Sequence, residues 1–122
     1  MILTPRTVNA RAAKSTRVSL GWRHPKDWKR LHSLELRASD GGETVGRITI
    51  DPARGRVSGD GALRPVHTDS KVSHHGKTVT AALAMRASKK LAGRTLRLSV
   101  QATDVRGRRQ VEPLAGTLTV KN

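Results

Sequence analysis

The stretch from residue 91 to residue 107, LAGRTLRLSVQATDVRG, constrains the fold of this chain more than any other segment. Every second residue in its middle is apolar, which is the period of a half-buried β-strand. The apolar positions are Leu96, Leu98, Val100 and Ala102. Ala92-Gly93 marks the start of this strand, and the turn residues from Asp104 to Gly107 mark its end.

The same alternation recurs along the chain and predicts further strands near residues 18–22, 33–39, 44–50, 78–85 and 115–120. Asp40-Gly41-Gly42 is a strong hairpin signal between two of them. Gly46 interrupts the alternation of the next strand and indicates a β-bulge. Residues 81–91 also suit a helix by composition, but the flanking residues favour a strand followed by a short helical turn at 88–91. Residues 56–73 have no clear period, and their strand assignment stays open.

The composition fits a single domain of 122 residues with a core built mainly from aliphatic side chains. Cysteine, phenylalanine and tyrosine are absent, so disulfides and thiolate metal sites are excluded. Trp22 and Trp28 are the only aromatic residues, and Trp22 alternates with Val18 and Leu20 as a core residue would. About seven short strands separated by turns are typical of an all-β, antiparallel β-sandwich.

Residues 1–15 have no clear period, and we expect them to form an N-terminal arm or linker, with an edge strand at most near residues 1–4. The sandwich domain is expected to occupy residues 16–122. The first residues lack the continuous apolar segment of a signal peptide, and no apolar run approaches the length of a membrane span. The chain is therefore expected to be cytoplasmic, or a piece of a longer secreted or cell-surface protein whose export signal lies elsewhere.

The C-terminal part resembles the immunoglobulin-like and fibronectin type III-like modules of bacterial secreted and surface proteins. The matching residues are Leu91-Ala92-Gly93, the alternating run 95–102, Thr103-Asp104, Gly107 and the closing run AGTLTV at 115–120. The resemblance covers residues 77–120 and implies an immunoglobulin-like sandwich. The chain departs from the family pattern at Leu96, which stands where many of these modules carry a corner tyrosine, and in having no cysteine pair.

No pattern of residues indicates a catalytic, cofactor or metal site. Ala102-Thr103-Asp104 is similar to the calcium motif of cadherin-like repeats, but the arginines that follow would repel a cation, so Asp104 is expected to cap a turn. His67, Asp69, His74 and His75 match no metal-ligand spacing, and adjacent histidines on a strand point to opposite faces. The serines and histidines lie in no nucleophile motif. The chain is therefore predicted to be non-catalytic.

The net charge of +15 favours contact with anionic partners. In an immunoglobulin-like sandwich, the loop between the second and third strands and the loop between the last two strands lie at the same end. We therefore predict one basic, ligand-binding patch with an exposed tryptophan that can stack on a sugar or a base. Its residues are Arg23, Lys26, Trp28, Lys29, Arg30, Arg106, Arg108 and Arg109.

Three functions remain open at this point. The first is a structural spacer or protein-contact and adhesion unit within a larger, extracellular protein. The second is a stand-alone binder of polyanions, either nucleic acid or acidic polysaccharide, with a steep salt dependence. The third is a subunit of a filament or shell whose N-terminal arm pairs with an open sheet edge of a neighbour. The expected partners are other protein domains or subunits, or a polyanion, with no membrane insertion.

Overall fold

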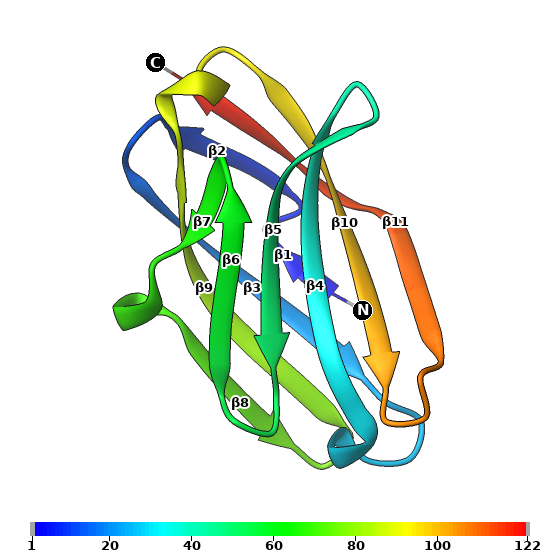
Figure 1. Cartoon of the computed structure of the whole chain (residues 1–122). Coiled ribbons are helices and arrows are strands. Elements are labelled where there is room, and N and C mark those ends of the chain that lie inside the picture. The colour runs from blue at the N-terminus through cyan, green and yellow to red at the C-terminus, as the bar shows by residue number, and fades with distance from the viewer. Residues whose placement is uncertain (1, 122) are drawn as a thin grey trace.

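The structure is a computed structural model that describes residues 2 to 121, and its strands form two sheets packed face to face (Figure 1). The first sheet contains β1 (Ile2–Thr4), β3 (Ser15–Arg23), β7 (Leu63–Pro65), β8 (Lys71–His75) and β9 (Thr78–Ala87). The second sheet contains β2 (Thr7–Arg11), β4 (Leu31–Asp40), β5 (Glu43–Asp51), β6 (Arg56–Gly61), β10 (Thr95–Asp104) and β11 (Arg109–Lys121). The connections include three short 3-10 helices, η1 (Trp28–Arg30), η2 (His67–Asp69) and η3 (Lys89–Leu91).

The strand order identifies the sandwich as immunoglobulin-like. The first sheet runs β1-β3-β9-β7, with β8 also paired to β9, and the second runs β2-β11-β10-β4-β5-β6. All the pairings are antiparallel except the one between β2 and β11, which is parallel. Two strands beyond β4 extend the sheet that holds the last two long strands, as in immunoglobulin domains of the variable type. The predicted fold class, an all-β sandwich, is confirmed.

β10 lies at the centre of the second sheet, between β11 and β4, and corresponds to the strand on which the sequence prediction was built. Its four alternating apolar residues are at most 4% exposed and face the first sheet. Burying a leucine or valine side chain stabilises a fold by about 1.5–3 kcal/mol. Trp22 on β3 is 7% exposed and belongs to the same core, as predicted.

The hairpin and the bulge predicted near residue 46 are both present. Gly41 and Gly42 connect β4 to β5 with φ angles of 59° and 89°, the left-handed backbone that a two-residue hairpin turn of type I′ requires. Ala38 pairs with Gly46, whereas the next residue of β4, Ser39, pairs with Thr44, so Val45 is the extra residue of a bulge.

The arm expected at residues 1–15 is not an arm. β1 pairs with β3 in the first sheet, and β2 pairs with β11 in the second. Leu3 and Val8 are each 2% exposed and contribute to the core. The first strand is thus split between the two sheets, so no single alternation runs through it, and this is why the segment looked irregular.

The segments that the sequence left ambiguous are also ordered. Residues 56–75 form the short strands β6, β7 and β8 with η2 between the last two. Residues 81–87 belong to β9, and η3 follows at once, which confirms a strand with a short helical turn after it rather than a helix. Between residues 2 and 121 the structure has no helix with the length and apolar character needed to cross a membrane.

Candidate functional site

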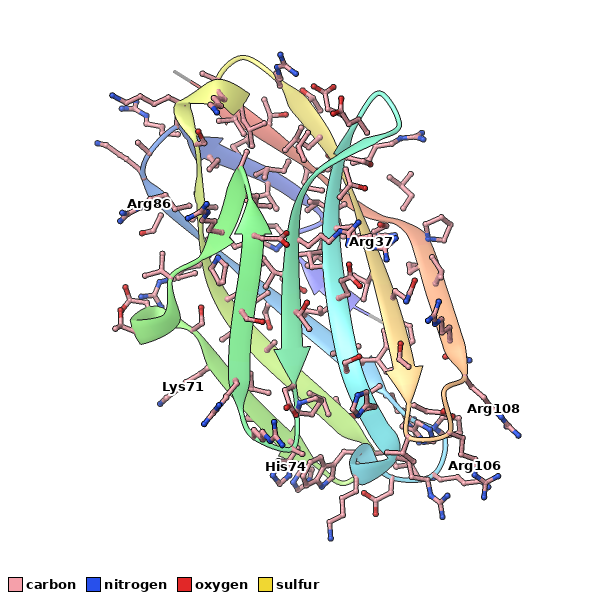
Figure 2. All side chains as sticks on the ribbon, in the orientation of Figure 1. Arg37, Lys71, His74, Arg86, Arg106 and Arg108 are labelled. Carbon is pink, nitrogen blue, oxygen red and sulfur yellow. The ribbon has the colours of Figure 1, made fainter. Side chains whose placement is uncertain are left out.

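Two loops meet at one end of the sandwich. The first connects β3 to β4 through residues 24–30 and includes η1, and the second is the turn between β10 and β11. They are joined directly, since the backbone N–H of Val105 donates a hydrogen bond to the carbonyl oxygen of Arg30 at 2.8 Å. Figure 2 shows Arg106 and Arg108 projecting at this end of the molecule, where His74 also lies. We call the surface formed by residues 23–30 and 105–109 the basic loop end.

The first loop is held against the first sheet by backbone hydrogen bonds. The N–H of His24 donates to the carbonyl oxygen of Lys77 at 2.8 Å, and that of Trp28 donates to Gly76 at 3.3 Å. Asp27 begins η1, and its carboxylate accepts a hydrogen bond from the N–H of Lys29 at 3.0 Å. This cap satisfies a backbone donor that the short helix would otherwise leave unpaired. The loop therefore holds its basic residues in a defined conformation.

The second loop is organised by Asp104. One oxygen of its carboxylate accepts hydrogen bonds from the backbone N–H groups of Arg106 and Arg108, both at 2.9 Å. Gly107 adopts a φ angle of 83°, and its N–H donates to the Asp104 carbonyl oxygen at 3.0 Å. This confirms that Asp104 caps a turn. Among the side chains that the structure describes, no cluster of three or more His, Asp or Glu could hold a metal ion; the side chain of His67 lies outside that part.

The electrostatics of the turn follow from these contacts. Desolvation raises the pKa of Asp104, but the hydrogen bonds from Arg108 and Arg106 and the positive charges of Arg108 and His24 outweigh it. The pKa of this carboxyl is therefore held below its usual range. The turn carries this one carboxylate against the three arginines Arg106, Arg108 and Arg109, so its net charge stays positive.

The lowered pKa of Asp104 predicts a pH dependence for the turn. Because the folded pKa lies below the unfolded value, the stabilisation is fully present above the usual aspartate pKa and is lost as the pH falls through the lowered folded pKa. We expect the amide signals of Arg106 and Arg108 in NMR spectra to shift over that acidic range. In Asp104→Asn, which keeps an acceptor oxygen but does not titrate, they should not shift. Identical titration curves in both proteins would contradict this assignment.

A pocket of about 170 Å³ lies between the two loops. Its walls include the apolar side chains of Trp22, Leu31 and Ala102, which also belong to the core. Four predicted site residues line it, namely Lys26, Arg30, Arg106 and Arg108. His24, which belongs to the same predicted basic loop, also lines the pocket, as does Gln110, which the sequence missed because no motif marked it. The site combines an apolar wall with a rim of four cationic residues, and Asp104 is the one carboxylate residue that lines it.

The other predicted site residues lie outside this pocket. Arg23 ends β3, Lys29 is exposed on η1, and Arg109 begins β11, where it pairs with Thr103. Trp28 was expected to be exposed and free to stack on a ligand, but it is only partly exposed and packs against the core. Its ring is stacked on His74 of β8, with the ring centroids 3.6 Å apart and the planes inclined by 15°. One face of the tryptophan is thus already covered by the protein.

Two solved structures that are similar to this chain share little sequence with it. No protein-family model matches the sequence, and the search of curated proteins gave no match. Murine CRIg is similar in structure at 14% sequence identity, covering 97% of this chain and 94% of that one with a TM-score of 0.48. A DUF4466 family protein from Parabacteroides merdae is 11% identical, with a TM-score of 0.44. That match covers 86% of this chain and 38% of the DUF4466 protein. The immunoglobulin-like assignment rests on the strand order described above.

Proposed function

We propose that the chain is a non-catalytic, immunoglobulin-like contact module that binds an acidic segment of a partner protein at the basic loop end. The observation that supports this most directly is the joining of two basic loops around one pocket. Lys26 and Arg30 come from one loop and Arg106 and Arg108 from the other, and all four line the same cavity. Loops at the end of an immunoglobulin-type sandwich are a surface on which binding residues are commonly presented by a rigid scaffold.

The size of the pocket favours a side chain over a free small molecule. At about 170 Å³ it is smaller than the roughly 300–1,000 Å³ of typical small-molecule sites. The apolar wall suits the aliphatic part of one partner side chain, and the cationic rim suits neighbouring carboxylates. Arginine pairs well with carboxylates because its planar guanidinium donates two parallel hydrogen bonds. A peptide segment with mixed acidic and aliphatic residues satisfies both features.

The alternative, recognition of nucleic acid or acidic polysaccharide at this same end, is less well supported. Recognition of single-stranded nucleic acid relies on aromatic stacking platforms. Trp22 is buried, and the ring of Trp28 is stacked on His74. The hypothesis of a filament or shell subunit required a free N-terminal arm. β1 and β2 are instead paired within their own chain, which leaves no free arm within residues 2–11.

In this proposal the module serves as an adhesion or spacer unit of a longer protein that is secreted or displayed on the cell surface. The support is the immunoglobulin-like fold together with the resemblance of residues 77–120 to modules of such proteins. The proposed location is tested by raising antibodies against this domain and probing surface, secreted and cytoplasmic fractions. Detection in the cytoplasmic fraction alone would reject it.

The binding proposal predicts that a double variant of the rim weakens capture of an acidic peptide. The probe is a short labelled peptide in which Glu and Leu alternate, with a Gln-Leu peptide as the uncharged control. Ion pairs at exposed positions contribute up to about 1 kcal/mol each. Arg30→Gln with Arg108→Gln should therefore raise the Kd by about tenfold, on the order of two lost contacts. Fluorescence anisotropy measures the change.

A matched control removes the same charge elsewhere. Arg17→Gln with Arg86→Gln changes two exposed arginines on β3 and β9, far from the pocket lining. This variant should bind the acidic peptide nearly as well as the parent protein. Equal weakening by the two double variants would show that net charge, and not the loop end, holds the peptide. Equal binding of the two peptides would reject the acidic specificity.

A further inference from the structure

Charge is distributed unequally between the two sheets. The five strands of the first sheet, with the bounds given above, carry five Arg or Lys residues and no Asp or Glu. These residues are Arg17, Arg23, Arg64, Lys71 and Arg86. Asp69, which is exposed in η2, is the single carboxylate between residues 61 and 103. The first sheet is thus a surface of one sign.

The second sheet is balanced. Its six strands carry seven Arg or Lys and seven Asp or Glu. The ion pairs found between residues 2 and 121 all use carboxylates of β4 or β5, such as Glu35 with Arg37 at 2.8 Å and Asp40 with Arg94 at 2.6 Å. The excess positive charge is therefore not shared between the two sheets: the strands of the first sheet carry +5 of the net +15, and those of the second sheet carry none of it.

The cations of the first sheet point to solvent. On β3 the residues Val18 and Leu20 are buried, so Arg17 and Ser19 face outward, and on β9 the exposed Ala82 and Arg86 do the same. The residues between the charges are small, since Ser19 pairs with Ala82 and Gly21 pairs with Thr80. Figure 2 shows Arg86 and Lys71 on the side of the molecule away from Arg37, Arg106 and Arg108. The face is a flat sheet surface with arginine and lysine side chains standing over small residues.

One pair of cations on this face is held together by the fold. Arg64 of β7 pairs with Arg86 of β9 in the strand register, so two like charges lie directly opposite each other. Such a pair destabilises a sheet. The Nε of Arg64 donates to the carbonyl oxygen of Gly61 at 3.0 Å, which fixes the side chain without neutralising it. Lys90 lines the same open cleft as the two arginines, and no carboxylate lines it. An anion bound there would relieve the repulsion.

We propose that the outer face of the first sheet is a docking surface for an acidic polysaccharide, distinct from the basic loop end. Charge complementarity requires a partner with repeated anionic groups, because the cations extend from the cleft at Arg86 across β3 and β8. Single-stranded nucleic acid is disfavoured because the described residues of the first sheet present no outward tryptophan, and Phe and Tyr are absent from the sequence. Duplex DNA is read by a helix or a two-stranded ribbon that enters its major groove, whereas this face is formed by paired strands within a sheet. A flexible chain with external sulfates or carboxylates is able to lie across it.

The test uses the whole chain and heparin as the probe, with affinity measured at several salt concentrations. Arg17→Gln with Arg86→Gln should weaken heparin binding about tenfold and reduce the slope of log Kd against log salt by about two. Arg37→Gln with Arg97→Gln removes the same charge from the outer face of the second sheet and should change the Kd less than about twofold. Circular dichroism melting controls for folding. A second pair on the same face, Arg64→Gln with Lys71→Gln, replaces the first if that variant unfolds.

An equal loss of heparin affinity in the first-sheet and second-sheet variants would overturn the proposal, because heparin binding would then depend on net charge alone. Tighter binding of a short DNA duplex than of heparin at the same salt, abolished by the same first-sheet variant, would overturn the choice of polysaccharide. Binding of the Glu-Leu peptide is measured in the same variants as an independent control. Its binding should survive the first-sheet variants, so a failure of this proposal is separable from a failure of the peptide site at the loop end.

Discussion

Replacing Trp22 by alanine is expected to lower the free energy of unfolding by about 3–5 kcal/mol, the usual cost of truncating a buried tryptophan. Trp22 is 7% exposed, and it is the one tryptophan buried in a core otherwise made of aliphatic side chains. Its loss would leave a cavity between β3 and the facing sheet that the neighbouring leucines and valines cannot fill. Urea denaturation followed by circular dichroism gives the change.

The same substitution should also impair peptide binding, because Trp22 lines the pocket between the two loops. Trp28→Ala is the matched control, since it truncates the other tryptophan at a partly exposed position. We expect it to cost less, about 1–2 kcal/mol, mostly from lost packing and from the lost stack on His74. An equal or larger loss for Trp28→Ala would contradict the assignment of Trp22 as the core tryptophan.

Gly46→Val is expected to destabilise the protein by about 3 kcal/mol, at the upper end of the range for overpacked cores. A Cβ atom at residue 46 would lie 2.7 Å from the Cβ of Leu63 and 2.9 Å from its backbone nitrogen. Leu63 belongs to β7 in the first sheet and is 1% exposed, so the backbone of β5 at Gly46 lies directly against a buried residue of the first sheet. Backbone atoms cannot move aside as a flexible side chain can.

Thr44→Val is the control for that substitution. Thr44 is exposed on the same strand, so adding a β-branched apolar residue there should change the free energy of unfolding by less than about 0.5 kcal/mol. Differential scanning calorimetry of the two variants separates a steric effect at Gly46 from a general effect of valine in β5. Similar melting temperatures for both variants would show that β5 and β7 are able to separate without cost.

The long strands were predictable because each has one face in the core and one in solvent, so its sequence alternates over its whole length. β3 and β10 behave in this way throughout, and β4 and β9 do so over most of their length. β2 escaped prediction, and β1 was expected only as an edge strand near residues 1–4, because a strand that passes from one sheet to the other buries too few residues in each to establish a period. β6 is exposed along most of its length, so burial leaves no pattern on it.

The site was predictable only where it depends on strand order. Two loops at one end of a sandwich must lie close together, and the structure places Arg30 against Val105 as that argument requires. The stack of Trp28 on His74 was not predictable, because it depends on β8, which the sequence left unassigned. The cationic face of the first sheet was missed for a related reason. Its arginines lie on strands distant in sequence, and no local motif shows that they share one surface.

The most direct test of the account is an NMR titration of the labelled chain with the Glu-Leu peptide. The account predicts that chemical-shift changes gather at residues 22–31 and 102–110, around the pocket, with the outer face of the first sheet nearly unaffected. Changes of similar size at Arg17, Lys71 and Arg86 would contradict it. In that case the peptide would be held by diffuse positive charge, and the basic loop end would have no special role.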